Sequence, residues 1–522
     1  MTDVWPPEGL IGDSGVVTVR LSMFGPERYR CPASDALKAR GLRPRTRAAW
    51  KPEALETFPG AAFMAAADEL DRGPGASWAA SQGGGRGRPL HDGLRQWTRH
   101  ALDVYRKTFP ADPDLRLAAR PWVYKHERST PQGQVEYRIA AWGRCLESAD
   151  GRRRELRLPV NRLRVRTGPE RAVAALVAAE GDSDPRLEDV RVVQFALLDG
   201  GQETLFEGTR AEALAEYRSE GAAAVRALLA SREYRPGSAC VSCAVAPVCP
   251  VLPKAFGLLA TTDRSRPRRS WSSTTGRGHR GCPARGYLRG LRIPSDDVVE
   301  RSAAAERGRA VHAFLAERHS RRPRTPCTAE IPPDWVPAAY RLPDEERQLG
   351  VELLRHHAEV CPLQADRPQS SFLVEPRLSF DDTAADLLVL AEPDLLYQDG
   401  GSWVWRETKT SGSDRPVREV MATYPQLALA VRIVGAGVLP GPQAGGRVEL
   451  ELLRPGGADL RILDPFAPST RETARALVRE QVSGWHAETA FEAVPGPECD
   501  ACEMARWCSA RERRPAGPGA RQ

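Results

Sequence analysis

The sequence predicts an α/β protein built from two tandem domains, each with a mixed central sheet flanked by helices. Its 522 residues are too many for one ordinary hydrophobic core, and a hydrophobic fraction of 41% suits a globular protein. Strand-like and helix-like segments follow one another in the same order in both halves. A cysteine pattern near the end of each half further predicts that a four-cysteine metal centre closes each domain.

The cysteine pattern is Cys-x2-Cys-x5-Cys, and in each half a Cys-Pro dipeptide lies far upstream of it. In a reducing compartment such paired cysteines indicate metal ligands rather than disulfides. A zinc ion and an iron–sulfur cluster both accept four thiolates, so the spacing alone leaves the two open. The expected ligands are Cys31, Cys240, Cys243 and Cys249 in the first half and Cys282, Cys499, Cys502 and Cys508 in the second. The other three cysteines, Cys145, Cys327 and Cys361, are predicted to be packing residues.

The two halves also share the order of their other segments. Residues 86–91 (RGRPLH) correspond to residues 307–312 (RGRAVH), and both introduce a stretch with helical apolar spacing. Strand-like runs follow, and a long helical pattern precedes each cysteine set. The predicted organisation is a domain at 1–261, a basic linker at 262–281, a domain at 282–510 and a disordered tail at 511–522.

Two segments of biased composition are predicted to lack regular structure. Residues 73–88 form a low-complexity loop rich in Gly, Ala and Ser. Residues 262–281 are rich in Arg, Ser, Thr and Gly, which predicts a flexible tether. A contact with the DNA backbone is the alternative interpretation of the second segment, because its arginines could pair with phosphates.

Charge and hydropathy limit the classes of function. A net charge of +7 and a pI near 8.9 allow a nucleic-acid-binding face without requiring one. The N-terminal residues lack the pattern of a signal peptide, and no uncharged apolar run is long enough for a membrane helix. We therefore expect a cytoplasmic protein with no membrane partner. No GxxxxGK[ST] phosphate loop is present, so a helicase or other motor would have to be a separate partner.

A segment with two acidic residues and a lysine in the second half predicts a catalytic site. Residues 389–397 and 402–406 indicate two strands joined by a glycine turn, which would place Asp394 and Glu407 at neighbouring strand ends. The alternation of a strand puts Glu407 and Lys409 on one face. Lys409 is one of only six lysines among 75 basic residues, in a chain whose Arg-rich composition is typical of a GC-rich genome.

Two carboxylates and a lysine on one face suit phosphodiester hydrolysis. Asp394, Glu407 and the carbonyl oxygen of Thr408 would offer oxygen ligands to Mg2+ or Mn2+. Such a metal activates water and neutralises phosphate charge, while Lys409 would orient that water or stabilise the transition state. His312 would add a nitrogen ligand and favour Mn2+. The alternative is a cross-strand ion pair on a solvated sheet, with an ordinary histidine on the preceding helix.

This ordered set resembles the PD-(D/E)XK nucleases of the RecB/AddB type, including the iron–sulfur exonucleases associated with CRISPR adaptation. The resemblance spans residues 270–510 and rests on Cys282-Pro283, Gly308, His312, Glu375, Asp394, Glu407-Thr408-Lys409, Gln426, Cys499, Cys502 and Cys508. It implies a restriction-endonuclease-like fold in which the histidine, aspartate and glutamate bind the metal and the lysine is catalytic. It also implies that the four cysteines hold a [4Fe-4S] cluster, which favours iron over zinc in the second half and, less strongly, in the first.

The sequence departs from the family pattern at two places. The family's helix after the active site usually reads Gln-x3-Tyr, whereas here Gln426 is followed by Ala430 at the matching position. Nearby Tyr424 is the candidate substitute, so Gln426 and Tyr424 are the predicted substrate-binding residues. The glycine common before the family's aspartate is also absent, since residues 391–393 are Ala-Glu-Pro. Neither departure removes a metal ligand.

The first half, aligned in the same way, lacks a complete site. Residues 154–157 (RELR) fall opposite residues 406–409 (RETK), so that Glu155 and His91 survive while Arg157 replaces the lysine. No carboxylate stands where the second half has its aspartate. The first half is therefore predicted to be a catalytically inactive nuclease fold, kept as a scaffold or DNA-binding surface. A second active site with unusual residues is the alternative.

The predicted function is a metal-dependent DNA nuclease, exonuclease-like on single strands or DNA ends, with one or two structural iron–sulfur clusters. The alternative is a catalytically inactive DNA-binding or assembly subunit of a repair or defence complex. A zinc-stabilised regulator would explain the cysteines but leave the Asp, Glu and Lys set unexplained.

Overall fold

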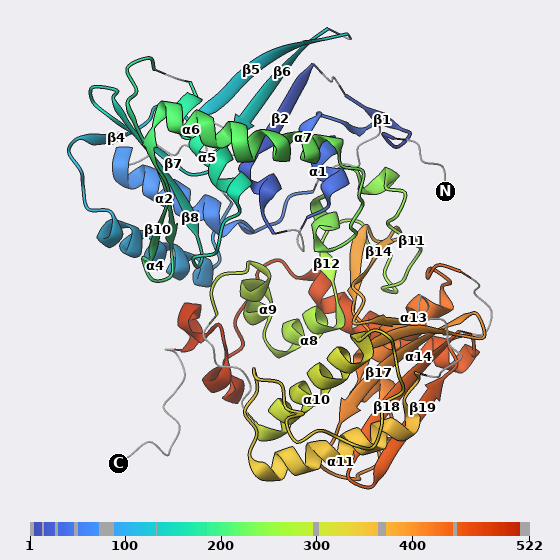
Figure 1. The fold of residues 1–522 in the computed structure, drawn as a ribbon. Helices are drawn as coiled ribbons and strands as arrows, with labels where there is room; N and C mark the ends of the chain where they lie inside the picture. The colour runs from blue at the N-terminus through green and yellow to red at the C-terminus, as the bar shows by residue number, and fades with distance from the viewer. Residues whose placement is uncertain are drawn as a thin grey trace, which may run out of the picture.

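The structure is a computed structural model, and it describes residues 5–12, 15–26, 30–45, 51–72, 88–131, 133–182, 184–295, 302–363, 372–441 and 446–511. The predicted low-complexity loop at 73–88 and tail at 511–522 lie outside these residues, apart from residues 88 and 511. The two halves of the chain form two α/β bodies that lie against each other (Figure 1).

A five-stranded sheet is the centre of the second half. Its order is β13-β16-β17-β18-β19, and β17 and β18 are its one parallel pair. A smaller sheet has the order β11-β14-β15-β12. The strands are β11 (Lys254–Ala255), β12 (Ser270–Trp271), β13 (Phe372–Val374), β14 (Leu378–Asp382), β15 (Leu387–Ala391), β16 (Leu395–Asp399), β17 (Ser402–Thr410), β18 (Arg447–Arg454) and β19 (Gly457–Leu463).

Helices cover both faces of the five-stranded sheet (Figure 1). Trp405, Val448 and Leu450 belong to one core cluster with the apolar face of α13, whereas Leu453, on the opposite parity of β18, packs with α10 and α11. The helices of this half are α8 (Ser273–Gly281), α9 (Pro283–Gly290), α10 (Ala303–Ser320), α11 (Asp344–Val360), α12 (Val420–Thr423), α13 (Pro425–Gly435) and α14 (Pro468–Ala487).

The first half has a five-stranded sheet of order β10-β9-β8-β7-β4, a three-stranded sheet of order β2-β6-β5 and a small pair, β1-β3. The strands are β1 (Leu10–Ile11), β2 (Val16–Arg20), β3 (Arg43–Pro44), β4 (Leu115–Leu117), β5 (Val123–Thr130), β6 (Gly133–Ala140), β7 (Arg144–Ser148), β8 (Arg153–Val160), β9 (Asp189–Ala196) and β10 (Gln202–Thr209). The helices are α1 (Pro32–Ala39), α2 (Pro59–Arg72), α4 (Asp92–Thr108), α5 (Gly168–Glu180), α6 (Arg210–Glu216) and α7 (Ala222–Ala230), with a π-helical segment, η3 (Tyr217–Gly221), between the last two.

The two five-stranded sheets share one topology. Read from β4 and from β13, each sheet has two antiparallel pairs, then a parallel pair, then an antiparallel pair. In both halves the last three cysteines of the set lie in or directly after short 3-10 turns that follow the last long helix. These turns are η4 (Ser238–Ser242) and η5 (Ala246–Val248) in the first half and η7 (Pro497–Ala501) and η8 (Ala505–Trp507) in the second; two further turns are η1 (Leu21–Phe24) and η9 (Ser509–Arg511).

The halves are joined by a shared hydrophobic core. Trp97 of α4 is fully buried and packs edge-on against Trp507 of the last cysteine turn, with ring centroids 5.1 Å apart. Leu288 of α9 and Phe63 of α2 lie in the same cluster. The C-terminal cysteine segment therefore packs against the first half as well as closing the second, as the red segment beside α9 and α4 shows (Figure 1).

The predicted flexible tether is wrong for residues 270–281. These residues form β12 and α8. β12 pairs with β15, and the side chain of Trp271 is fully buried. The predicted boundary at residue 261 also needs correction, because β11 pairs in parallel with β14 of the second half. Both differences have one physical cause. β11 and β12 are short strands whose hydrogen-bond partners lie far away in the sequence, and local composition does not reveal such pairing.

Among the described residues, no helix is both long enough and apolar enough to cross a membrane.

A substitution at Gly93 tests the packing between the two halves. A Cβ at this position of α4 would lie 2.7 Å from the carbonyl oxygen of Trp507 and 2.8 Å from the Leu288 side chain. Gly93→Ala should therefore lower the free energy of unfolding by about 1–3 kcal/mol, the usual cost of overpacking. Chemical denaturation of the full-length protein measures the change.

The matched control is Gly278→Ala in α8, where a Cβ would meet no atom within 4 Å. Because alanine is the better helix former, this variant should be neutral or more stable by up to about 1 kcal/mol. Equal stability of the Gly93→Ala variant and the unmodified protein would contradict the close packing described here.

Candidate active site

The candidate site is built where β16 begins beside β17. Leu395 pairs with Arg406, so Asp394, one residue before β16, lies next to Glu407. The backbone N–H of Thr408 donates a 2.7 Å hydrogen bond to Asp394 Oδ2, which fixes this carboxylate at the strand end. The predicted hairpin is confirmed for residues 395–399 and 402–406, and it brings Asp394 and Glu407 together. The predicted single strand at 389–397 is wrong, because β15 ends at Ala391 in the smaller sheet and β16 begins at Leu395.

Lys409 joins the two carboxylates. Its Nζ lies 3.1 Å from Glu407 Oε2, 3.3 Å from Asp394 Oδ2 and 2.9 Å from the carbonyl oxygen of Thr408. Trp405 Nε1 donates a 3.0 Å hydrogen bond to the other oxygen of Glu407. Trp405, Glu407 and Lys409 alternate along one face of β17, as the period of two predicts.

His312 approaches the site from α10. Its Nδ1 lies 3.4 Å from Asp394 Oδ1. Gly308, one helical turn earlier, allows α10 to lie close to β17, because a Cβ there would be 3.1 Å from Thr410 Oγ1. The four predicted residues His312, Asp394, Glu407 and Lys409 therefore meet at one place.

Burial and charge set the protonation of this group. Burial favours the neutral form of Asp394, but His312, Lys409 and the Thr408 N–H outweigh it and hold the pKa of Asp394 well below its usual range. Burial and the negative charge of Asp394 raise the pKa of Glu407. Burial opposes the ammonium form of Lys409, yet Asp394 and Glu407 together raise its pKa. The site thus combines an ionised Asp394, a more basic Glu407 and a charged Lys409.

Glu375 is an additional acidic residue beside this group. It adopts a positive φ of 45°, and its backbone N–H donates a 3.1 Å hydrogen bond to the carbonyl oxygen of Asp394. Partial burial and the charges of Asp394 and Glu392 raise the pKa of Glu375. In the sequence, only the family resemblance singled this residue out.

The two predicted substrate-binding residues lie at the start of α13. Tyr424 is the residue before the helix, and Gln426 lies in its first turn. Gln426 Oε1 is 3.5 Å from Arg277 Nη2 of α8. Their position connects the site with α8 but does not by itself test substrate binding.

The first half has different residues at the positions of the catalytic set. Arg144, the first residue of β7, pairs with Arg157, just as Leu395 of β16 pairs with Arg406. The residue before β7 is Gly143, which therefore stands where Asp394 stands in the second half. One step further along β8, Leu158 takes the position of Glu407.

The predicted alignment of Glu155 with Glu407 and of His91 with His312 is therefore wrong. Glu155 instead accepts hydrogen bonds from Arg157 Nε at 2.5 Å and Arg191 Nη1 at 3.1 Å. His91 lies at the N-terminal end of α4, where its Nδ1 accepts from the Gly93 N–H, whereas His312 lies inside α10. The error arose because similar local sequences occupy different registers, and pairing with neighbouring strands sets the register.

The fold brings the first predicted cysteine set together around one cavity, and in the second set it brings Cys282 close to Cys502. Cys31 and Cys282 are the N-cap residues of α1 and α9. Backbone N–H groups of Arg235 and Gly237 lie 3.4 Å from the sulfurs of Cys31 and Cys240. In the second half, Val494 N is 3.5 Å from Cys282 Sγ and Gly496 N is 3.3 Å from Cys499 Sγ.

The first set lines a cavity of about 230 Å³ that also contains Ser34 and Tyr234. Burial raises the pKa of Cys240 to about 11, and the neighbouring thiols Cys31, Cys243 and Cys249 add to the shift. Burial and the neighbouring thiols both oppose the ionisation of Cys240, and a bound cation would remove that penalty. The donor atoms therefore fit a thiolate-bound metal centre.

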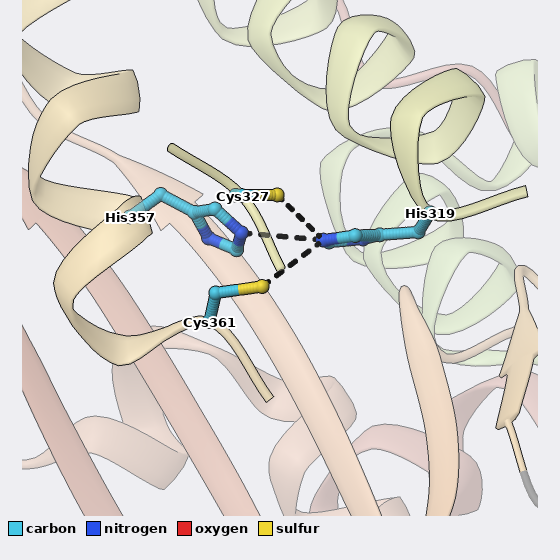
Figure 2. A group of neighbouring side chains, drawn as sticks. All are labelled: His319, Cys327, His357 and Cys361. Atoms are coloured by element: carbon cyan, nitrogen blue, oxygen red, sulfur yellow. Dashed lines mark hydrogen bonds between the residues drawn. The ribbon is translucent and has the colours of Figure 1, made fainter. Parts of the chain in front are cut away.

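One group of possible metal ligands was missed by the sequence analysis. Cys145, Cys327 and Cys361 all pack in hydrophobic clusters, as predicted. The prediction is incomplete for Cys327 and Cys361, because both thiols also contact His319, which faces His357 (Figure 2). The available signal was His357-x3-Cys361, a spacing that puts two ligands on one face of a helix end.

Comparison with known proteins finds one family model and solved structures that are similar to this chain. A crystal structure of SSO0001 matches with 14% sequence identity over 27% of this chain and 60% of that chain, with a TM-score of 0.18. No curated protein matches the sequence. Residues 270–509 match the model of the PD-(D/E)XK nuclease superfamily. The second half therefore carries a PD-(D/E)XK nuclease superfamily domain, and that family implies phosphodiester hydrolysis and a nucleic-acid substrate.

Proposed function

We propose that this protein is a divalent-metal-dependent deoxyribonuclease whose active site is formed by Asp394, Glu407 and Lys409. The observation that carries the proposal is the contact of one lysine ammonium with both carboxylates at the end of β17. Mg2+ or Mn2+ fits this donor set, because carboxylate and carbonyl oxygens are the ligands those ions prefer. Asp394, Glu407 and the carbonyl oxygen of Thr408 would hold it.

When bound, the divalent ion supplies an activated water and neutralises charge on the scissile phosphate. Lys409 supplies a fixed positive charge beside it. Because Asp394 and Glu407 raise the pKa of Lys409, its side chain is an ammonium at neutral pH and stabilises developing negative charge. The Thr408 N–H and the Trp405 indole hold the two carboxylates in place while this happens.

His312 distinguishes between the two metal ions. Its imidazole faces Asp394 Oδ1 and is the one nitrogen among the proposed ligands. Imidazole suits Mn2+ better than Mg2+, so a preference for Mn2+ follows from the proposal.

A basic cleft supports a nucleic-acid substrate. It has a volume of about 1190 Å³ and lies between residues of both halves, with α8 along one side. Eight Lys or Arg residues line it but only three acidic ones. Arg264 and Arg266 come from the segment for which a DNA-backbone contact was the alternative prediction. Phosphate contacts of this kind give affinity without sequence specificity.

The first half serves in this proposal as an inactive partner domain. Its five-stranded sheet has the strand order of the nuclease sheet, which supports a tandem repeat of one fold. Gly143 and Leu158, at the catalytic positions, offer no ligand to a metal. The basic cleft and the core around Trp97 indicate that this half supports the second and contributes to DNA binding.

Each cysteine set is proposed to hold a [4Fe-4S] cluster. A tetrahedral zinc ion would bring its four sulfurs to roughly 3.8 Å of one another. Among the described residues, the His and Cys group in Figure 2 is the one with at least three ligand atoms all within 4.8 Å. The thiols of both cysteine sets are therefore spread more widely than one zinc ion requires, which favours a larger inorganic centre.

The alternative function is a DNA-binding or assembly subunit without catalysis, in a repair or defence complex. It predicts DNA binding through the same cleft but no cleavage. A motor such as a helicase would act in trans under either function.

Glu407→Gln and Lys409→Ala should each reduce DNA hydrolysis by at least about 10²–10³-fold, because each removes a charge that acts on the reacting phosphate. Degradation of single- and double-stranded DNA in Mn2+ or Mg2+ measures the loss. The matched control is Glu155→Gln, which also neutralises a buried carboxylate beside a cation on a central strand. It should retain nearly full activity; complete loss with correct folding would assign catalysis to the first half. Unmodified protein that cleaves no DNA would support the alternative function.

Replacing Arg264 and Arg266 together by alanine should weaken DNA binding at every sequence and lower the salt dependence of the affinity. With about 0.9 counterions released per phosphate contact, the slope of log K against log salt should decrease by about 2. Fluorescence anisotropy over a salt series measures it, with exposed Arg479→Ala of α14 as the control. An unchanged slope in the double variant would exclude the cleft as the DNA path.

Protein purified without oxygen should be brown and contain iron and acid-labile sulfide in equal amounts. Cys499→Ser should remove the iron of one cluster while Cys145→Ser keeps all of it, because Cys145 lies in an apolar core. Iron and sulfide analysis with visible absorption provides the readout. Iron-free, colourless protein with correct folding would contradict the iron–sulfur assignment.

A further inference from the structure

We infer that His319, Cys327, His357 and Cys361 bind a structural zinc ion, separate from the catalytic metal and from the two cysteine centres. The four residues come from the end of α10, the segment after it, and the end of α11 (Figure 2). They form the Cys2His2 set that is typical of closed structural zinc sites.

The spacing of the ligand atoms fits a single tetrahedral ion. Bonds of about 2.0–2.1 Å to nitrogen and 2.3 Å to sulfur place the ligands roughly 3.3–3.8 Å from each other. In the structure, His319 Nε2 lies 3.2 Å from His357 Nε2, 3.4 Å from Cys327 Sγ and 3.9 Å from Cys361 Sγ. All four ligand atoms lie within 4.8 Å of one another.

Three of the four residues are buried, and Cys327 is half-buried. His357 is fully buried, and His319 and Cys361 are 2% and 6% exposed. Two imidazoles and two thiols here face one another rather than water. A zinc ion satisfies all four at once, and two thiolates balance its charge.

A buried carboxylate orients one of the histidines. Glu451 Oε1 lies 2.6 Å from His357 Nδ1, so that Nε2 of this imidazole faces the other three residues. Metal-bound histidines commonly donate their second N–H to a carboxylate in this way. The contact fixes the tautomer that a zinc ligand needs.

The same carboxylate reaches the catalytic strand. Glu451 Oε2 accepts a 3.0 Å hydrogen bond from Thr408 Oγ1, and Thr408 lies between Glu407 and Lys409. Arg406 Nη1 donates to the carbonyl oxygen of Val360, next to Cys361, at 2.7 Å. The zinc ion would therefore hold α10 and α11 against the face of β17 that is opposite Glu407 and Lys409.

The two kinds of site differ in the metals that they accept. The group of Figure 2 offers sulfur and nitrogen, whereas Asp394 and Glu407 offer oxygen. Zinc prefers the first set and Mg2+ or Mn2+ the second. One chain can therefore hold both metals without exchanging them.

Metal analysis of the full-length protein tests the inference. The unmodified protein should contain one zinc more per chain than the variants His357→Ala and Cys361→Ser, each of which removes a ligand. The matched control is His356→Ala, the neighbouring residue on α11, whose imidazole Nε2 instead faces the carbonyl oxygen of Pro455. This control should retain the zinc. Zinc content that is equal in all four proteins would overturn the inference.

Two further measurements keep the test decisive if a ligand variant does not fold. X-ray absorption at the zinc edge of the unmodified protein should show nitrogen at about 2.0–2.1 Å and sulfur at about 2.3 Å. An all-sulfur environment would assign the zinc to a cysteine set and overturn the inference. Glu451→Gln leaves all four ligands and should weaken zinc retention by about 10–100-fold in a chelator competition; unchanged retention would overturn the role of Glu451.

Discussion

The pairing of β17 with β16 on one side and β18 on the other is the constraint on which the site depends. Because a strand alternates, this pairing sends Glu407 and Lys409 to one face and Arg406 and Thr408 to the other. The first face meets Asp394 at the start of β16. The second face meets acidic residues of β18, since Arg406 pairs with Glu449 and Thr408 with Glu451. β17 thus carries Glu407 and Lys409 on one face and, on the other, the side chains that fix the strand in place.

That arrangement places several charges in the interior, and each has a partner. Glu449 receives hydrogen bonds from Arg406, Arg447 and the Tyr397 hydroxyl, while Glu451 is held by His357 and Thr408. Breaking a buried pair by removing one partner costs several kcal/mol, so such a network is rigid only while it is complete. The network therefore fixes the position of Thr408, and with it the residues on either side.

Features carried by local spacing could be predicted from the sequence, whereas features set by strand pairing could not. The Asp394 and Glu407 hairpin follows from two strands and a glycine turn, and the structure has it. In the first half, the position that corresponds to Glu407 was predicted three residues too early. Glu155 lies in a similar local sequence, but the pairing of β7 with β8 puts Leu158 at that position. The His and Cys group was missed for a related reason, since α10 and α11 are far apart in the sequence and pack against each other only in the folded chain. The pairing of β11 with β14 is a third case.

The distribution of ligand types over the two faces of β17 would keep the two proposed metals apart. A carboxylate site that binds and releases Mg2+ or Mn2+ needs partial exposure, and the side chains of Asp394 and Lys409 are each 23% exposed. A structural ion instead needs burial and four strong ligands, which the ends of α10 and α11 offer. Thr408 lies between the two environments, since its N–H holds Asp394 and its hydroxyl holds Glu451. A change in the packing of α11 can therefore reach the catalytic carboxylate through one residue, without any contact between α11 and the substrate.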